Sequence, residues 1–306
     1  MNRQNIIIDC DPGHDDAIAL LIASYSPKLN LLGVSTSSGN QTVEKTSINA
    51  SNLLHFFNRT DVPIAIGSPK PIIRESRICP EIHGESGLDG FYFPKYDHQF
   101  SKLKGYEQII KILKENDDVI VVTTGPMTNL GLAIKNEPSI VNCIKEIVLM
   151  GGSTNEGNIT KAAEFNILVD PEAANICFRS GVPLRMIGLN VTRQILARDE
   201  IVEEAEKLNT RGSDLFVKLM KVFNQNQRDF FGLEAGPLHD PATIVSLLND
   251  KAIRFEEMNV EIDTSFTDQA GKTICQKKKP YNCLVATSVN LEEYWKEIYK
   301  HLEMCK

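Results

Sequence analysis

The chain has 306 residues, of which 42% are hydrophobic and 24% are charged, and its formal net charge at pH 7 is -7. This balance is typical of a globular protein with a sizeable core and excludes a disordered chain. The negative charge argues against a nucleic-acid or anionic-membrane surface, since both favour a basic face, so a small ligand is expected.

The cysteines and the start of the chain indicate a reducing compartment. Seven cysteines include no C-x-x-C pair, so neither a zinc ribbon nor a disulfide framework is predicted. Residues 1–5 lead into an apolar run without a signal-peptide pattern, and no stretch approaches the ~20 apolar residues of a membrane span. We therefore expect a soluble, cytoplasmic protein.

Apolar, β-branched runs recur along the chain and are mostly separated by helical patterns. The predicted strands are residues 5–9, 29–35, 62–66, 119–123, 146–150 and 184–187. This alternation predicts parallel βαβ units. The fold class is therefore α/β, with an open, mainly parallel central sheet and helices on both of its faces.

Later segments predict further helices and strands. Asp170 and Pro171 form an N-cap and first-turn pair, and Gly181 stands where that helix would end. Two helices split near Gly212 are expected in residues 198–231, and another in residues 237–248.

The C-terminal part, residues 253–286, predicts short strands around Gly271, with Lys277–Lys279 as a solvated hairpin turn. A last helix spans residues 291–301. These elements are expected to complete one domain that comprises residues 1–306.

Four aspartates lie within eight residues at the end of the first predicted strand: Asp9, Asp11, Asp15 and Asp16. Two ionised carboxylates ~4 Å apart repel by roughly 4 kcal/mol at an effective dielectric of about 20, so a fold that gathers several must bind a cation or protonate some of them. The strand passes through Pro12-Gly13 into a helical pattern, which places these side chains at the carboxyl edge of the sheet. Open α/β proteins keep their sites there.

Other predicted strands also end in polar residues, which converge on the same edge. They are residues 35–40, 123–126 and 150–152, followed by Asn158, Glu164 and Asn166 and by His239-Asp240 before a late helix. Carboxylate and carbonyl oxygens favour a hard cation, Ca2+ or Mg2+, over zinc.

Two other metal motifs fit less well. An EF-hand loop that starts at Asp9 would place Gly13, His14 and Leu20 where that motif needs an acidic or amide residue, a glycine and a glutamate. A strand-ending D-x-D also occurs in Mg2+-dependent haloacid dehalogenase-type phosphatases. These usually have Thr or Val where this chain has Gly13, and they carry a downstream Gly-Asp pair that is missing here.

The first motif, Asp9-Cys10-Asp11-Pro12-Gly13-His14-Asp15-Asp16-Ala17, resembles the signature of the inosine-uridine preferring nucleoside hydrolases. Further segments fit that family in order: Gly39-Asn40, 83–88, 124–129, 148–152, 163–166, 170–174 and His239-Asp240-Pro241. Each piece is weak by itself, but the ordered series is specific. It spans about residues 5–245, and residues from 250 onward carry little of it.

The resemblance implies a site for Ca2+ and ribose. The metal ligands would be Asp11, Asp16, the Thr124 carbonyl and Asp240. The ribose hydroxyls would be held by Asp15, Asn40, Asp240, Asn158, Glu164 and Asn166, above a floor that contains Met150. Phe165 would be either core or pocket wall.

The resemblance also implies the reaction, which is hydrolysis of the N-glycosidic bond of a ribonucleoside to base and ribose. Asp11 would take a proton from a Ca2+-bound water, and His239, with His83 as alternative or partner, would assist the departing base. The carboxylates would stabilise an oxocarbenium-like charge on the sugar. Such an enzyme would serve nucleoside salvage as a homodimer or homotetramer.

The base preference is expected to favour pyrimidine nucleosides, with some inosine activity. Family members that accept purines tend to place tyrosines near the base, whereas this chain offers Phe223, Gln227 and Phe231. The Gln227 amide suits the exocyclic groups of uracil or cytosine, while Phe223 can stack on a purine. The alternative function is a non-catalytic nucleoside-binding protein.

Overall fold

The apolar runs of the N-terminal two thirds form a parallel sheet. The computed structural model describes residues 3–306. Met1 and Asn2, which belong to the N-terminal segment where no signal peptide is expected, lie outside the described residues. The parallel strands are β1 (Gln4–Cys10), β2 (Leu29–Thr36), β3 (Ile64–Ala65), β4 (Val119–Thr123), β5 (Ile144–Met150) and β6 (Leu184–Ile187). All six predicted strands are present, and β3 is shorter than expected.

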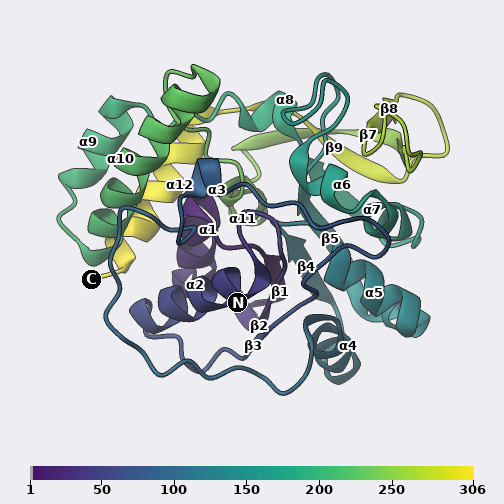
Figure 1. Cartoon of the computed structure of the whole chain (residues 1–306), viewed down its shortest axis with the longest axis horizontal. Coiled ribbons are helices and arrows are strands. Elements are labelled where there is room, and N and C mark those ends of the chain that lie inside the picture. The colour runs from purple at the N-terminus through teal and green to yellow at the C-terminus, as the bar shows by residue number, and fades with distance from the viewer. Residues whose placement is uncertain (1–2) are drawn as a thin grey trace.

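Three C-terminal strands extend this sheet to nine, in the order β3-β2-β1-β4-β5-β6-β9-β7-β8 (Figure 1). They are β7 (Ile253–Ile262), β8 (Thr273–Gln276) and β9 (Cys283–Val289). β9 runs parallel to β6, whereas β7 is antiparallel to β9 and β8 is antiparallel to β7. Lys277–Lys279 are exposed as expected, but the hairpin prediction is wrong, because these residues connect two strands that flank β7.

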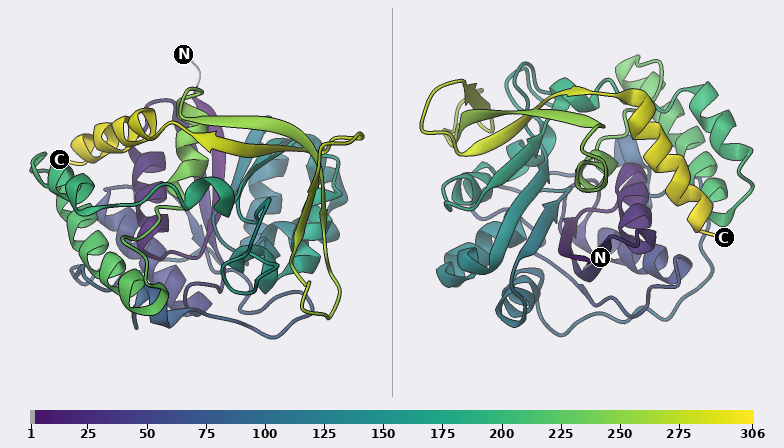
Figure 2. Two further views of the ribbon diagram at one scale, coloured as in Figure 1. Left: turned by 90° about the horizontal axis from the view of Figure 1, so that it is seen from above. Right: turned by 180° about the vertical axis from the view of Figure 1, so that it is seen from behind.

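Helices cover both faces of the sheet, as predicted for this α/β class. One face carries α1 (His14–Tyr25), α2 (Val43–Phe56), α10 (Arg211–Phe231), α11 (Pro241–Leu248) and α12 (Leu291–Met304). The other carries α4 (Gly105–Glu115), α5 (Thr128–Asn136) and α7 (Pro171–Phe178). Viewed from behind, α12 runs alongside α1 and α10 (Figure 2).

The remaining helical segments are short and lie mostly in connections. They are α3 (Pro80–His83), η1 (Pro138–Cys143), α6 (Phe165–Val169), α8 (Leu189–Thr192) and α9 (Asp199–Glu206). Among residues 3–306, no helix combines the length and the apolar character that a membrane crossing needs.

Three predicted helix boundaries are corrected. Asp170 caps α7 as expected, but α7 ends at Phe178, before the left-handed Gly181. The break between α9 and α10 falls at residues 207–210, and Gly212 lies inside the first turn of α10, where it packs against α12. The helix expected from residue 237 starts at Pro241, since Asp240 is its N-cap.

Side chains along β1 point alternately to the two faces of the sheet, so β1 contributes to the apolar core on both faces. Ile6 and Ile8 belong to the apolar cluster under α1 and α10, whereas Ile7 belongs to the cluster under α4 and α5. All three side chains are fully buried, which contributes about 2 kcal/mol each by area. This packing fixes β1, and with it the residues that follow its end.

The strand order reverses direction at β1, because β2 lies on one side of it and β4 on the other. At such a switch point the loops after the two central strands diverge and leave a crevice at their carboxyl ends. Asp9 and Cys10 end β1, and Thr123 ends β4, so the residues that follow face this crevice.

Candidate active site

The first turn of α1 presents two of the predicted acidic residues. Asp16 accepts a hydrogen bond at 3.0 Å from the N–H of Gly13, the N-cap of the helix, and another at 2.7 Å from the Thr124 hydroxyl. A helix N-terminus favours negative charge, which stabilises carboxylates at these positions. The sequence Pro-Gly-His-Asp-Asp therefore fixes Asp15 and Asp16 at the edge of the sheet.

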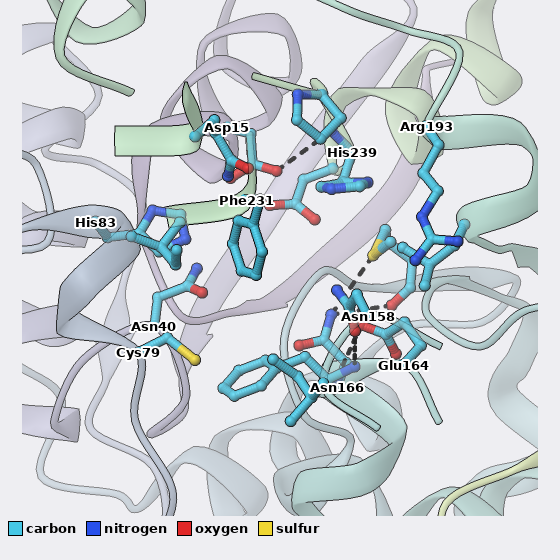
Figure 3. A pocket seen from close by; sticks show the side chains of 18 of the residues that line it. Asp15, Asn40, Cys79, His83, Asn158, Glu164, Asn166, Arg193, Phe231 and His239 are labelled. Atoms are coloured by element: carbon cyan, nitrogen blue, oxygen red, sulfur yellow. Dashed lines mark hydrogen bonds between the residues drawn. The ribbon is translucent and has the colours of Figure 1, made fainter. Parts of the chain in front are cut away.

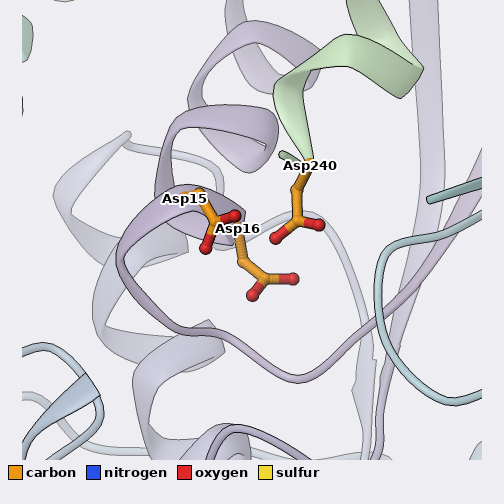
Figure 4. Close-up of side chains that lie close together, drawn as sticks. All are labelled: Asp15, Asp16 and Asp240. Carbon is orange, nitrogen blue, oxygen red and sulfur yellow. The ribbon is translucent and has the colours of Figure 1, made fainter. Parts of the chain in front are cut away.

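Asp240 approaches this pair from a distant part of the chain. It is the N-cap of α11, and its carboxylate makes no capping bond to that helix. One carboxylate oxygen from each of Asp15, Asp16 and Asp240 lies within 4.8 Å of the other two, and all three residues are buried (Figure 4). The structure thus brings together two regions that the sequence separates by more than 200 residues.

Asp11 lies next to this group and is linked to it through Asn40. The Asn40 backbone N–H donates to Asp11 Oδ2 at 2.7 Å, and its side-chain amide donates to Asp16 Oδ2 at 3.0 Å. Asp11 Oδ1 is buried without a hydrogen-bond partner among the described residues. A buried oxygen left unpaired is costly, so this atom is available for a ligand.

Burial dominates the electrostatics of the cluster. It raises the pKa of Asp15, with help from the charge of Asp16, from 3.8 to about 7. Burial also raises the pKa of Asp16, and burial together with neighbouring carboxylate charges raises the pKa of Asp11 and of Asp240 well above the usual range. The cluster therefore either holds extra protons or requires a positive partner.

The residues fit a hard divalent cation. The acidic side chains gathered here, Asp11, Asp15, Asp16 and Asp240, offer carboxylate oxygens, which suit Ca2+ or Mg2+ rather than zinc. Space is kept by glycines, because a Cβ on Gly39 would lie 2.0 Å from Asp11 Oδ2 and one on Gly125 would lie 2.5 Å from Asp11 Oδ1. The predicted ligands all lie here, although the trio of closest carboxylates contains Asp15 in addition to Asp16 and Asp240. The Thr124 carbonyl accepts a hydrogen bond from the Asn166 side-chain amide at 2.8 Å.

A pocket of about 400 Å³ opens over this cluster (Figure 3). Most predicted site residues line it: Asp15, Asn40, His83, Thr124, Met150, Asn158, Glu164, Phe165, Asn166, Gln227, His239 and Asp240. Asp11 and Asp16 are fully buried and do not line it. Phe165, which was expected as core or wall, contributes to the pocket wall.

One end of the pocket is built from a loop and the start of α6. Glu164 is the N-cap of α6 and accepts backbone N–H groups of Gly152, Asn166 and Ile167 at 2.8–3.1 Å. Burial nevertheless raises its pKa from 4.5 to about 7. Asn158 accepts from the Phe165 N–H at 2.9 Å, so these polar groups hold the loop as well as face the pocket.

The other end carries histidines and aromatic rings. His83, on α3, stacks on Phe223 of α10 with ring centroids 5.5 Å apart, and His14 stacks on both. His83 Nδ1 accepts from the His14 backbone N–H at 3.2 Å. Gln227 and Phe231 follow on α10, and Phe231 is 48% exposed at the mouth.

His239 lies beside the carboxylates at the centre of the pocket. Its backbone N–H donates to Asp15 Oδ2 at 3.3 Å (Figure 3). Its ring Nδ1 lies 2.7 Å from the Thr192 hydroxyl. Burial, followed by the charge of Arg193, lowers the pKa of His239 to about 3. The ring is therefore neutral around pH 7.

Several residues of the site escaped the sequence interpretation. Arg193 lines the pocket and donates to the Gly157 carbonyl at 2.6 Å, beside Asn158. Thr192 contacts His239, and Cys79, Ile82, Leu196 and Pro237 are among the further residues that line the pocket. These residues lie in short, motif-free connections, and only the position of α8 after a predicted strand could have drawn attention to Thr192 and Arg193.

The fold and site together indicate an α/β enzyme whose active site is built around a carboxylate cluster, and sequence comparison specifies the family. The family model of the inosine-uridine preferring nucleoside hydrolases matches residues 6–296. The chain therefore belongs to this family and is a ribonucleoside hydrolase.

Individual relatives agree with this assignment. The pyrimidine-specific ribonucleoside hydrolase RihB of Escherichia coli is 39% identical over 300 residues, 96% of each chain, and so is RihB of Escherichia fergusonii. Among solved structures, the purine-preferring ribonucleoside hydrolase from Gardnerella vaginalis matches with a TM-score of 0.90 and 29% identity, covering 98% of this chain and 99% of that one. The plant nucleoside hydrolase PpNRh1 matches with a TM-score of 0.93, 27% identity and the same coverage.

Proposed function

We propose that this chain, acting as one catalytic domain, hydrolyses pyrimidine ribonucleosides to free base and ribose with the help of one Ca2+ ion. The observation that carries the proposal is the buried trio of Asp15, Asp16 and Asp240, whose oxygens lie within 4.8 Å of one another at a nucleoside-sized pocket. Asp11 and the Thr124 carbonyl complete an all-oxygen set of ligands. When bound, Ca2+ supplies the positive charge that holds ribose hydroxyls and makes a nearby water more acidic.

Asp11 acts as the general base in this proposal. Its Oδ1 is buried and unpaired among the described residues, whereas Oδ2 is fixed by the Asn40 N–H at 2.7 Å. One oxygen therefore orients the group and the other is free to accept a proton from the attacking water. A base held in this way typically contributes 10²–10⁴-fold to the rate.

The carboxylates also suit the charge that develops on the sugar. Breaking the bond between C1′ and the base nitrogen leaves positive charge on the ribose ring, and the electron pair departs with the base. Asp15, Asp240 and Asn40 face the pocket, where they bind hydroxyls, and the two carboxylates stabilise that positive charge. A 2′-deoxyribose would lose the contacts at Asp15 and Asn40.

The base preference is argued from Gln227 and from relatedness. Gln227 lines the pocket beside the ring of Phe223 and offers both an amide donor and an amide acceptor to a pyrimidine edge. The 39% identity to a protein described as pyrimidine-specific exceeds the 29% identity to one described as purine-preferring. We therefore infer uridine and cytidine as preferred substrates, with weaker activity on inosine.

A substrate panel tests this proposal. The purified protein is incubated with uridine, cytidine, inosine, adenosine and thymidine, with calcium or with a chelator, and released ribose or deoxyribose is measured. We expect ribose from uridine and cytidine, less from inosine, little sugar from thymidine, and loss of activity with the chelator. Absence of ribose from every nucleoside would favour a non-catalytic binding protein and contradict the proposal.

A homodimeric or homotetrameric state and a place in nucleoside salvage also belong to this proposal. The resemblance to the family supports both. Mass photometry of the purified protein measures the oligomeric state directly, and a monomer at micromolar concentration would contradict that part.

A further inference from the structure

The side chain of Thr192 makes one contact that the reaction as described does not use. Thr192 ends α8 and is fully buried, and its hydroxyl oxygen lies 2.7 Å from Nδ1 of His239. His239 is separated from it by 47 positions in the sequence. The contact therefore has to be built by the fold.

Backbone pairing holds the two residues in place. The Leu238 N–H donates to the Ile195 carbonyl at 2.8 Å and the Ala197 N–H donates to the Gly236 carbonyl at 2.9 Å. These bonds join the segment after Thr192 to the segment before His239 as a short antiparallel bridge. The start of α8 is held by a further hydrogen bond, which the Leu189 N–H donates to the Gly152 carbonyl at 2.9 Å.

In the described part of the chain, the Thr192 hydroxyl is hydrogen-bonded to His239 Nδ1. Helical threonines commonly donate back to a carbonyl in the preceding turn, as Thr243 does to Asp240 at 2.6 Å. Among residues 3–306, the Thr192 hydroxyl makes no such bond, and its partner is His239 Nδ1. A buried hydroxyl that leaves its proton unpaired is destabilising, so the O–H donates and Nδ1 accepts.

The position of the ring proton follows from this bond. A neutral imidazole carries one N–H, and the hydrogen bond made by one ring nitrogen decides which nitrogen carries it. With Nδ1 accepting, the proton is on Nε2. His239 lines the pocket near Phe223 and Gln227, where the base is expected.

We propose that Thr192 is a positioning residue that sets His239 in the tautomer with its N–H toward the departing base. This inference rests on the proposed function. As the bond between C1′ and the base nitrogen breaks, its electron pair leaves with the base and Nε2–H donates a hydrogen bond to the base. The base then takes a proton from solvent, which balances the proton that Asp11 removes from water.

The kinetic test compares Thr192→Val, which removes the hydroxyl at nearly constant shape, with Thr192→Ser, which keeps it. Uridine is compared with p-nitrophenyl β-D-ribofuranoside, because nitrophenolate departs without help from a donor. We expect Thr192→Val to lower kcat for uridine at least tenfold with little change in KM, and to leave the nitrophenyl substrate within about twofold. Thr192→Ser should restore uridine turnover.

A His239→Ala background provides the matched control. If Thr192 acts through His239, adding Thr192→Val to that background should cause no further loss with uridine. An unchanged kcat for uridine in Thr192→Val, or equal losses on both substrates, would overturn the proposal. Equal losses would assign Thr192 a merely structural role.

A measurement independent of activity separates this inference from the proposed function. ¹⁵N NMR of histidine-labelled protein distinguishes a ring protonated at Nε2 from one protonated at Nδ1. We expect the Nε2–H form of His239 in the wild type and in Thr192→Ser, and a mixture in Thr192→Val. An Nδ1–H form in the wild type would overturn the tautomer assignment, whereas wild-type protein that releases no ribose would contradict the proposed function alone.

Discussion

Two sides of the same site are held in place by different kinds of contact. The carboxylate wall is defined as Asp15, Asn40 and Asp240, which line the pocket, together with Asp11 and Asp16, which are fully buried and do not line it. Backbone N–H groups hold three of its carboxylates: that of Gly13 on Asp16, that of Asn40 on Asp11 and that of His239 on Asp15. The base wall, defined as His83, Phe223, Gln227, Phe231 and His239, comes from α3, α10 and the segment before α11. It includes the stacked rings of His83 and Phe223; both rings and Gln227 are buried, whereas Phe231 is 48% exposed.

This difference matches the tasks of the two walls. Ribose and a cation require fixed oxygens, because misplacement by 1 Å costs orders of magnitude in rate. Base recognition tolerates more variation, since stacking and one amide contact accept several rings. Substitutions in the carboxylate wall should therefore affect turnover, as should those of His239, whereas substitutions of Gln227 in the base wall should mainly affect the choice among substrates.

The largest effect is expected from Asp11→Asn. The amide cannot accept the proton of water, so kcat for uridine should fall by about 10²–10⁴-fold. Thermal unfolding without calcium should not be lowered, because a neutral amide relieves repulsion among the buried carboxylates. The exposed Asp117→Asn serves as control and should keep wild-type kcat. Near-normal turnover in Asp11→Asn would remove Asp11 from the role of base.

Calcium should stabilise the protein more at high pH than at low pH. The folded-state pKa of Asp15 is raised to about 7, so without a cation this group contributes stability below pH 3.8 that is lost as pH rises through 7. A shift of this size corresponds to roughly 4 kcal/mol. Bound calcium favours the ionised form and should remove the loss.

Unfolding temperatures with calcium and with chelator, at pH 5 and at pH 8, measure this dependence. The calcium-induced rise should be clearly larger at pH 8, and Asp15→Asn should reduce the difference between the two pH values. An equal rise at both would show that the carboxylate wall does not bind the ion.

A smaller effect is expected from Gln227→Tyr in the base wall. The substitution replaces the amide that faces the pyrimidine edge with a phenol ring, which can stack on a purine. We expect the ratio of kcat/KM for uridine to that for inosine to fall about tenfold, with thermal stability nearly unchanged. If the ratio stays the same, Gln227 does not set base preference.

The smallest effect should follow from Phe231→Ala at the pocket mouth. The ring is 48% exposed, so its removal should raise KM for uridine a few-fold without lowering kcat. Unfolding should change by less than about 1 kcal/mol, since large losses require a buried ring. A large fall in kcat would show that Phe231 acts in the chemical step.

The same contrast explains how much the sequence could predict. The carboxylate wall is mostly contiguous in sequence, and its strand-turn-helix pattern predicted both its place in the fold and the kind of ion it suits. Strands 119–123 and 184–187 were predicted to the residue. Turn-favouring residues bound them, since Pro183 and Gly188 flank the second run and Gly125 follows soon after the first.

The base wall depends on contacts between distant segments. Thr192 meets His239 only because residues 195–197 pair with residues 236–238, and no local pattern encodes that pairing. The predicted C-terminal hairpin was wrong for a similar reason. Propensity predicts that β8 and β9 are strands, but long-range packing decides that β7 lies between them.

The most direct test is uridine hydrolysis by chelator-treated protein at a series of buffered free-calcium concentrations, with bound calcium measured in the same samples. We expect one tightly held Ca2+ per chain and a rate of ribose release that rises in proportion to occupancy. Full activity in protein shown to be free of calcium and other divalent metals would contradict the proposed role of the carboxylate cluster.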